Sequence, residues 1–259
     1  MLITGASGGI GLELTRLFAQ DRYNLVLVAR TGETLDAVAA DLRSVHGIST
    51  YVIARDLANP TAAHEIFNEV QQYGLSVDVL VNNAGLGTFG PFTATDLQTE
   101  LEVIAVNMAA LTALTHLFLP EMLKRKSGRI LNVASTAAFQ PGPLMAVYYA
   151  SKAYVVSFSE ALANELRGTG VTVTALCPGP TKTGFHARAA MEKSGMLKYL
   201  AVMDAETVAH AGYDAMMRGR TMVIPGYLNA LTVFAVRFIP RSLAATIARL
   251  IQQEPGKRK

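Results

Sequence analysis

Short apolar runs alternate with longer amphipathic segments along most of the chain. Continuous or nearly continuous apolar runs occur at 24–29, 49–54, 77–82, 128–135, 171–177 and 221–226. Such runs are typical of parallel strands that are covered on both faces. The segments between them, such as GLELTRLFAQ, TLDAVAADLRSV and AAHEIFNEVQQY, place apolar residues three and four positions apart and therefore predict helices.

This alternation predicts one α/β domain with a Rossmann fold. Strand–helix–strand units with right-handed crossovers build a doubly wound parallel sheet with helices on both faces. With a short run at 2–4 counted as the first strand, the sheet has seven strands, and no linker or internal repeat divides residues 1–259. Residues 227–252 are predicted to form an apolar helical segment that Pro240 breaks.

Composition narrows the class of protein. Half of the 259 residues are hydrophobic (51%) and 17% are charged, which suits a folded domain with a substantial core. The net charge of +3 is mild and the basic residues are scattered, so a nucleic-acid partner is not expected. The single cysteine, Cys177, excludes an internal disulfide, and we interpret it as a small core residue with no metal site around it.

The sequence carries no recognisable targeting segment. Glycines interrupt the apolar stretch at the N-terminus, which also lacks a basic flank. No uninterrupted apolar run reaches the roughly 18–20 residues that cross a bilayer. We therefore expect a cytoplasmic protein.

A glycine-rich loop follows the first short strand. The residues LIT lead into Gly5–Ala6–Ser7–Gly8–Gly9–Ile10–Gly11, which opens a predicted helix. We expect Gly5 to permit a tight turn, Gly9 to let the backbone approach a pyrophosphate, and Gly11 to allow close helix packing. An ordinary glycine-rich turn is the alternative. Because so little strand precedes the loop, we also expect a cost in stability.

The ends of the next strands bear on the choice of nucleotide. After the second strand, Ala29 offers no carboxylate for ribose hydroxyls, whereas Arg30 would favour a 2′-phosphate, which predicts NADP(H) in preference to NADH. A solvated cation is the alternative for Arg30. Asp56, after the third strand, is a candidate acceptor for the adenine amino group, and Asn83, after the fourth, is placed to tie neighbouring strands together.

The segment 132–158, NVASTAAFQPGPLMAVYYASKAYVVSF, carries the candidate chemistry. Ser135 ends a predicted strand, and Lys152 lies one helical turn beyond Tyr148, so the phenol and the ammonium share a helix face. We expect the ammonium to lower the pKa of the phenol, making Tyr148 an acid or base near neutral pH. Ser135 is placed to donate a hydrogen bond to a substrate oxygen.

Together these motifs resemble the classical short-chain dehydrogenase/reductase family over essentially the whole chain. TGASGGIG, NNAG, Asn107 in VNMAAL, Ser135, YYASK and CPGPTKT follow one another in the order found in that family. The resemblance implies a catalytic tetrad of Asn107, Ser135, Tyr148 and Lys152, in which Asn107 anchors a water that links Lys152 to solvent. Within the family, PGPTKTGFHARA and the late VIPG resemble the bacterial DltE-like group.

The resemblance also implies the cofactor contacts. The stretch after Pro178 would face the nicotinamide, with Thr181 and Thr183 near the carboxamide or pyrophosphate. The full set of expected cofactor-binding residues is Gly5, Ser7, Gly8, Gly9, Ile10, Gly11, Arg30, Asp56, Leu57, Asn83, Ala84, Gly85, Tyr148, Lys152, Pro178, Gly179, Thr181 and Thr183.

The predicted function is an NADP(H)-dependent oxidoreductase that interconverts a carbonyl and a secondary alcohol, with Tyr148 as acid or base. Segment 184–203, where the family keeps a substrate-covering loop, is rich in methionine, which predicts an apolar small-molecule substrate. His186 in that segment is a candidate extra acid–base group, but no spacing ties it to the tetrad, and we favour a solvated loop histidine. A non-catalytic NADP(H)-sensing regulator, or a membrane-surface reductase with a lipid-like substrate, are the alternatives.

The C-terminal apolar segment leaves two interpretations. Its apolar residues lie roughly along one helical face, near several arginines, and would suit a membrane surface. The apolar residues are Leu228, Leu231, Ala235, Phe238 and Ile239, and the arginines are Arg237, Arg241 and Arg249. We favour the alternative that these residues close the substrate pocket or form a subunit interface. The family resemblance implies a homodimer or homotetramer.

Overall fold

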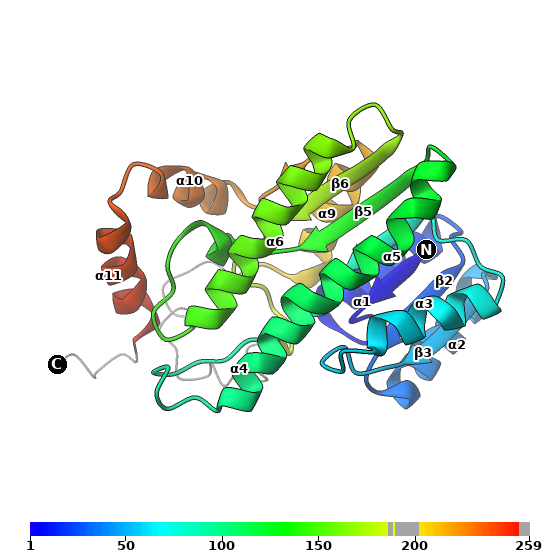
Figure 1. The fold of residues 1–259 in the computed structure, drawn as a ribbon, viewed down its shortest axis with the longest axis horizontal. Coiled ribbons are helices and arrows are strands. Elements are labelled where there is room, and N and C mark those ends of the chain that lie inside the picture. The colour runs from blue at the N-terminus through cyan, green and yellow to red at the C-terminus, as the bar shows by residue number, and fades with distance from the viewer. Residues whose placement is uncertain (186–188, 190–201, 254–259) are drawn as a thin grey trace.

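The computed structural model describes residues 1–185, 189 and 202–253 (Figure 1). Seven parallel strands form one sheet in the order β3-β2-β1-β4-β5-β6-β7. The strands are β1 (Leu2–Thr4), β2 (Leu25–Ala29), β3 (Thr50–Ala54), β4 (Val79–Asn82), β5 (Gly128–Val133), β6 (Val171–Leu176) and β7 (Met222–Val223).

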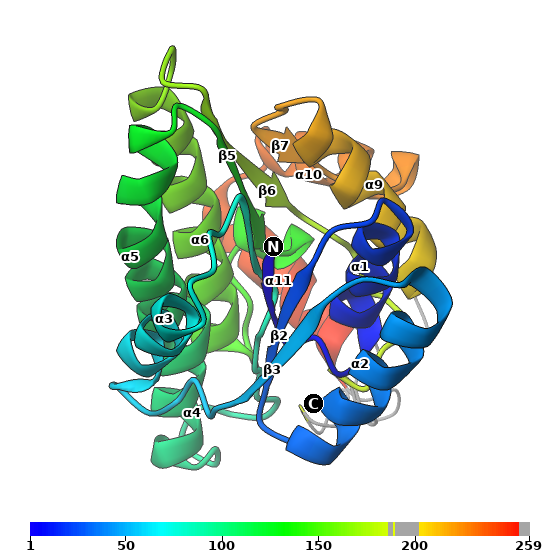
Figure 2. The same cartoon turned by 90° about the vertical axis from the view of Figure 1, so that its right-hand side faces the viewer.

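Helices connect the strands and cover both faces of the sheet. The helices are α1 (Gly9–Gln20), α2 (Gly32–His46), α3 (Ala62–Gln72), α4 (Leu97–Ile104), α5 (Leu111–Lys124), α6 (Ala146–Glu165), α9 (Ala205–Met217), α10 (Tyr227–Val236) and α11 (Arg241–Gln252). Figure 2 shows α1, α2 and α9 on one face and α3, α4, α5 and α6 on the other. The predicted doubly wound α/β fold is confirmed.

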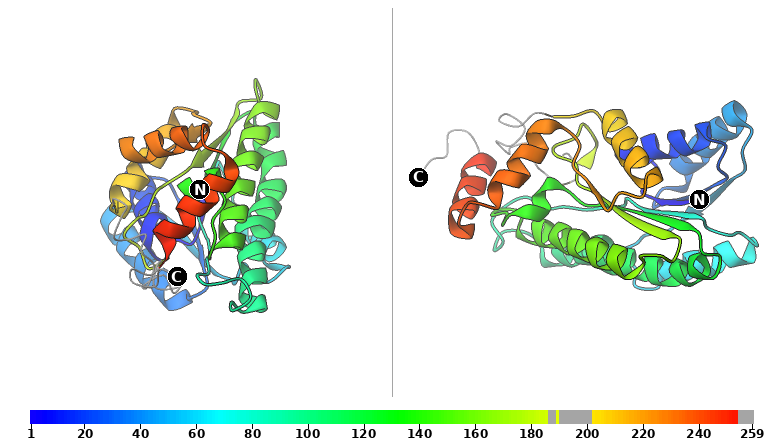
Figure 3. Two further views of the ribbon diagram at one scale, coloured as in Figure 1. Left: turned by 90° about the vertical axis from the view of Figure 1, so that its left-hand side faces the viewer. Right: turned by 90° about the horizontal axis from the view of Figure 1, so that it is seen from above.

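Two apolar cores lie on opposite faces of the sheet. One joins the strands to α1, α2 and α9 and includes Leu14, Phe18 and Leu35; the other joins them to α3 and α5. Because both faces are covered, nearly all side chains of the central strands β2 and β4 are buried, and this explains their mainly apolar sequence. The helices after β7 lie apart from these layers, at the end of the molecule opposite the N-terminus (Figure 3).

The first strand is short but central. β1 has three residues, all buried, and pairs with β2 on one side and β4 on the other. Strand order reverses around β1 and β4, which makes their carboxyl ends the topological switch point where ligands bind in open α/β sheets. The glycine loop that follows β1 therefore lies at this switch point, in the middle of the sheet.

Among the residues that the structure describes, one helical stretch, Leu97–Lys124, is long and apolar enough by length and composition to cross a membrane. It comprises α4, a π-helical segment at Ala105–Ala110 and α5. Its apolar character has a ready explanation within the fold, because Leu114, Phe118 and Met122 are buried in the core beneath the sheet.

A chain of buried polar side chains fastens the sheet to the helices of one face. The Asn82 amide, at the end of β4, donates to Thr115 Oγ1 on α5 (3.1 Å) and to Asn132 Oδ1 on β5 (2.9 Å). Asn132 donates in turn to Ser159 Oγ on α6 (2.9 Å), and the Ser159 hydroxyl donates to the Val155 carbonyl. The network links two strands and two helices directly behind the site described below.

We predict that Asn132→Ala lowers the free energy of unfolding by about 2–4 kcal/mol, because it removes side-chain volume and leaves buried polar partners unsatisfied. Thr172→Val, in the neighbouring strand β6, is the control, since the Thr172 hydroxyl is buried without a hydrogen-bond partner among the described residues. Urea denaturation measures both. A loss for Asn132→Ala no larger than that for Thr172→Val would contradict the role given to the network.

Candidate active site

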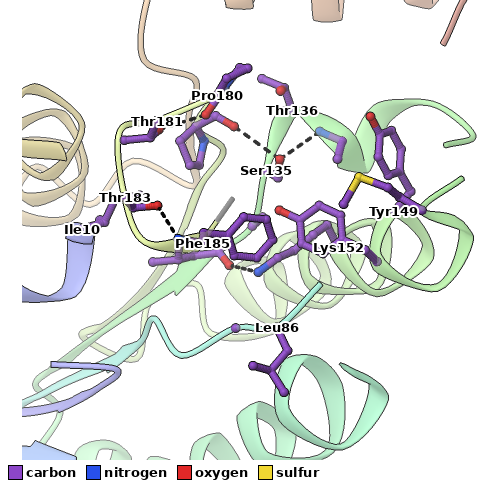
Figure 4. Close-up of a pocket in the computed structure, with 18 of the residues that line it drawn as sticks. Ile10, Leu86, Ser135, Thr136, Tyr149, Lys152, Pro180, Thr181, Thr183 and Phe185 are labelled. Atoms are coloured by element: carbon purple, nitrogen blue, oxygen red, sulfur yellow. Dashed lines mark hydrogen bonds between the residues drawn. The ribbon is translucent and has the colours of Figure 1, made fainter. Parts of the chain in front are cut away.

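One continuous pocket of about 560 Å³ lies at the carboxyl ends of the strands. One part of its lining comes from the loops after β1, β2, β3 and β4, and another from β5, α6 and the loop after β6. The helices α10 and α11 complete it. Sequence positions far apart, from the glycine loop to the last described helix, therefore face one cavity (Figure 4 shows its central part).

The glycine loop has the geometry expected of a phosphate cradle. Gly5 and Gly9 adopt positive φ values of 68° and 56°, which non-glycine residues rarely reach. A Cβ on Gly11 would lie 2.2 Å from the Gly5 carbonyl oxygen, so only glycine lets α1 start this close to the loop. Space remains open above Gly8, at the N-terminus of α1, where backbone N–H groups and the helix dipole favour an anion.

Asn83 holds this loop against β4. Its side-chain amide donates to the carbonyls of Thr4 (2.9 Å) and Gly5 (3.2 Å), and its backbone N–H donates to Thr4 Oγ1 (3.0 Å). The expected tie between neighbouring strands is thus present. Asn82, by contrast, belongs to the buried network behind the sheet and does not line the pocket.

The nucleotide end of the pocket contains two arginines in different situations. Arg55 is engaged by Glu65 (3.0 Å) and Glu69 (3.2 Å) on α3. Arg30 is exposed at the end of β2, lines the pocket, and makes no ion pair with any residue that the structure describes. Asp56 also lines the pocket, with one carboxylate oxygen accepting from the Ala58 N–H (3.0 Å). Arg30 is therefore the guanidinium that remains open to a phosphate.

The catalytic candidates Ser135, Tyr148 and Lys152 line the same cavity. The Ser135 hydroxyl accepts from the Ala137 N–H (3.1 Å) and donates to the Pro178 carbonyl over a long distance of 3.4 Å (Figure 4). A bond of that length is weak, so the hydroxyl can turn toward another acceptor. Lys152 Nζ donates to the Val133 carbonyl (2.8 Å) and lies 5.8 Å from the centroid of the Tyr148 ring.

The expected lowering of the Tyr148 pKa by Lys152 was wrong for this state of the protein. Burial raises the pKa of the Tyr148 phenol to about 12, and only a side-chain hydrogen bond from Ser135 opposes it. Burial also lowers the pKa of Lys152 to about 8. Desolvation outweighs charge attraction here because the ammonium is turned toward the Val133 carbonyl. At neutral pH the phenol is therefore protonated and able to donate.

Asn107 lies in the π-helical segment between α4 and α5, an irregularity often found at functional sites. Its side chain is buried, accepts from the Leu86 N–H (2.8 Å) and donates to the Leu86 carbonyl and to Ser151 Oγ (both 2.9 Å). A Cβ built on Gly85 would lie 3.4 Å from both Asn107 Oδ1 and Lys152 Nζ. The two side chains thus converge on one point beside the NNAG loop.

The loop after β6 brings its threonines to the cavity as expected. Thr181 Oγ1 donates to the Gly179 carbonyl (2.9 Å), and Thr183 Oγ1 accepts from the Phe185 N–H (3.2 Å; Figure 4). The Phe185 ring packs on Tyr148 with centroids 5.2 Å apart. Most of the expected substrate loop, including His186, Met191, Met196 and Leu197, lies outside the described residues.

Sequence reasoning missed a contact that closes the pocket. Gln252 Nε2, at the end of α11, donates to Tyr149 Oη (2.6 Å), and both side chains are buried in the cavity wall. Asn229 on α10 likewise packs against Gly179. Tyr149 follows the predicted catalytic tyrosine directly, but nothing in the local sequence pairs it with a glutamine 103 residues away. The buried, inert Cys177 is a core residue, as interpreted.

A glycine cradle at the switch point and a serine, tyrosine and lysine at the end of the same cavity define a dinucleotide-dependent oxidoreductase type of site. The family model of short chain dehydrogenases matches residues 1–194. The chain belongs to this family. The narrower resemblance to the DltE-like group stays a prediction.

Two known relatives are similar in sequence over most of this chain. A very-long-chain 3-oxoacyl-CoA reductase from Phaeosphaeria nodorum is 42% identical over 66% of this chain and 52% of its own length. The ketoacyl reductase HetN from Nostoc sp. is 32% identical over 86% of this chain and 77% of its own length. The chain therefore spans about half the length of the first of these relatives.

Among solved structures, a short-chain dehydrogenase from Sphingobium yanoikuyae in complex with NADPH is similar over 100% of this chain and 98% of its own, with 30% identity and a TM-score of 0.83. That protein holds NADPH in the same fold.

We predict that Lys152→Met raises the free energy of unfolding by about 1–3 kcal/mol at about pH 7, because the variant removes the cost of burying an ammonium. A pKa difference of one corresponds to about 1.4 kcal/mol, and the lost hydrogen bond to Val133 offsets part of the gain. The folded pKa of Lys152, about 8, lies below its ordinary value of 10.5. Between these values the unfolded chain binds more protons, so wild-type stability rises with pH and the advantage of the variant shrinks.

Urea denaturation of both proteins across this pH range checks the prediction. A variant that is less stable than wild type at about pH 7, with a difference that does not change up to about pH 10, would show that the buried ammonium costs nothing.

Proposed function

We propose that the protein is an NADP(H)-dependent oxidoreductase that reduces a carbonyl group to a secondary alcohol. The observation that carries this proposal is the convergence of Ser135, Tyr148 and Lys152 on the cavity that begins at the glycine loop. The similarity to ketoacyl reductases and to an NADPH-bound dehydrogenase supports the same reaction class.

The residues present fit NADP(H). The open space above Gly8 suits the pyrophosphate, and Arg30 is the available cation for a 2′-phosphate, with Ala29 offering no competing carboxylate. The loops with Asn83, Ala84 and Gly85 and with Thr181 and Thr183 would hold the rest of the molecule. Gly11 does not line the pocket and acts through the close packing of α1. The other proposed contacts all line the pocket; these are Gly5, Ser7, Gly9, Ile10, Asp56, Leu57, Pro178 and Gly179.

When bound, NADPH supplies the hydride that adds to the carbonyl carbon. Tyr148 donates its phenolic proton to the carbonyl oxygen, and the Ser135 hydroxyl donates a hydrogen bond that holds this oxygen beside the phenol. Lys152, with a pKa of about 8, can return a proton to the phenolate. Asn107, whose side chain meets the Lys152 ammonium beside Gly85, would anchor a water that links Lys152 to solvent.

The raised pKa of Tyr148 supports the reductive direction. A phenol with a pKa of about 12 stays protonated at neutral pH, which is the form that a carbonyl reduction needs. The wall contributed by α10, α11 and the turn between them is mostly aliphatic, with Val233, Val236, Ile239, Ile247 and Ile251, and this supports an apolar substrate.

We also propose that the chain assembles as a homodimer or homotetramer. Three apolar residues one turn apart on α4, Leu97, Leu101 and Ile104, are exposed and form a stripe that a second copy would cover. The cytoplasmic location remains a prediction from the sequence.

We predict that Tyr148→Phe abolishes turnover, with a loss of at least about a thousandfold in kcat, while NADPH affinity changes little, because only the proton donor is removed. Tyr149→Phe is the matched control, since its hydroxyl bonds to Gln252 and takes no part in proton transfer. NADPH absorbance with a panel of ketones measures both. Retained activity in Tyr148→Phe would refute the assignment of the proton donor.

We predict that Arg30→Ala weakens NADPH binding by roughly 10–100-fold and leaves NADH binding nearly unchanged, because only NADPH carries the 2′-phosphate. Arg55→Ala is the control, because Glu65 and Glu69 already occupy that guanidinium. Fluorescence titration with each nucleotide gives the four affinities. An equal loss for NADH and NADPH would contradict the role of Arg30.

A further inference from the structure

The helices α10 and α11 present a row of apolar side chains to solvent. On α10 and the turn after it, the exposed residues repeat along one helical face, and α11 adds three more at the same spacing. Their exposed fractions run from 40% to 81%; the residues are Tyr227, Leu228, Leu231, Phe234, Phe238, Leu243, Ile247 and Leu250. We call this set the α10–α11 apolar face.

This face differs from the wall of the pocket. The side chains that α10 and α11 turn toward the cavity, such as Val233, Ala244 and Ala248, are buried. Leu228 and Phe238, by contrast, are 65% and 74% exposed. The outward half of the segment therefore does not close the pocket, which leaves the subunit interface and the membrane surface as its two interpretations, since exposed apolar patches mark interaction sites.

The charge around the face is positive. Residues 227–253 contain Arg237, Arg241 and Arg249, all exposed, and no acidic residue. Six of the chain's 23 basic residues and one of its 20 acidic residues lie in 227–259, so the rest of the chain carries more acidic than basic residues. None of the three arginines forms an ion pair with a residue that the structure describes.

This combination favours an anionic lipid surface over a second copy of the chain. In a two-fold symmetric dimer the same patch meets itself, so these arginines would approach other arginines with no acidic partner on the face. At a bilayer, apolar side chains enter the boundary between headgroups and acyl chains, and arginines reach the anionic headgroups. Both interactions strengthen binding. Both helices lie at one end of the molecule, free of the sheet layers (Figure 3).

We propose that the α10–α11 apolar face docks the protein onto the surface of an anionic lipid bilayer. Ile247 belongs both to this face and to the pocket lining, so the cavity opens beside the docked surface. If the proposed reductase function holds, an apolar substrate can pass from the bilayer to Tyr148 without crossing water. The docking itself does not depend on that function.

Vesicle co-sedimentation of the full chain tests the proposal. The probes are vesicles of pure phosphatidylcholine and vesicles with about one third phosphatidylglycerol, at low and high salt. We expect binding to the anionic vesicles at low salt and much weaker binding to the neutral ones. Leu228→Ser/Phe238→Ser should reduce anionic binding by roughly tenfold or more, and Arg241→Gln/Arg249→Gln should reduce it and flatten its salt dependence.

Val45→Ser/Phe92→Ser is the matched control, because these residues are 64% and 62% exposed on other parts of the surface. The control should bind vesicles as wild type does, and the thermal midpoints of all variants should match. An equal loss in the control overturns the proposal, as does a wild type that binds neither vesicle. If wild type ignores vesicles and Leu228→Ser/Phe238→Ser dissociates an oligomer, the face is a subunit interface and the proposal fails. Carbonyl reduction is measured separately, so its failure leaves the docking result readable.

Discussion

The site depends on one buried charge. Lys152 places an ammonium inside the protein, where the Val133 carbonyl at the end of β5 is its hydrogen-bond acceptor at 2.8 Å. Desolvation lowers its pKa to about 8, and the same dry surroundings raise the pKa of Tyr148 to about 12. Two groups whose ordinary pKa values are nearly equal, 10.0 for the phenol and 10.5 for the ammonium, are thereby pushed apart. Near neutral pH the phenol is therefore a stable proton donor, and the ammonium exchanges protons readily.

The fold supplies the rigidity that such a buried pair needs. The network from Asn82 through Asn132 to Ser159 fastens α6, which carries Tyr148 and Lys152, to the central strands. On the opposite side of the pocket, the close start of α1 beneath the Asn83 amide fixes the glycine loop. The geometry of the sheet thus sets the distance between the glycine loop and Tyr148. The helices α10 and α11 lie outside the sheet layers, so the pocket wall that they form does not depend on this geometry.

The features that could be predicted from the sequence were those within one helix, strand or loop, and the order in which these elements follow one another. The strand runs, the glycine loop and the four-residue spacing of Tyr148 and Lys152 each lie within one element, and the break at Pro240 appears where α11 begins. Contacts between distant elements could not be predicted, such as the hydrogen bond between Gln252 and Tyr149. The pKa of Tyr148 was predicted in the wrong direction because helix spacing shows the nearby charge, whereas burial arises from tertiary packing, such as that of Phe185 from the loop after β6 against the Tyr148 ring.

The central claim is that a hydride passes from NADPH to a carbonyl carbon in this cavity while the Tyr148 phenol protonates the oxygen. The most direct measurement uses NADPH deuterated at the transferable C4 position together with a ketone that the wild-type protein consumes. Mass spectrometry of the product should show one deuterium, on the carbinol carbon. An alcohol without deuterium, or NADPH oxidation without any alcohol, would contradict the account.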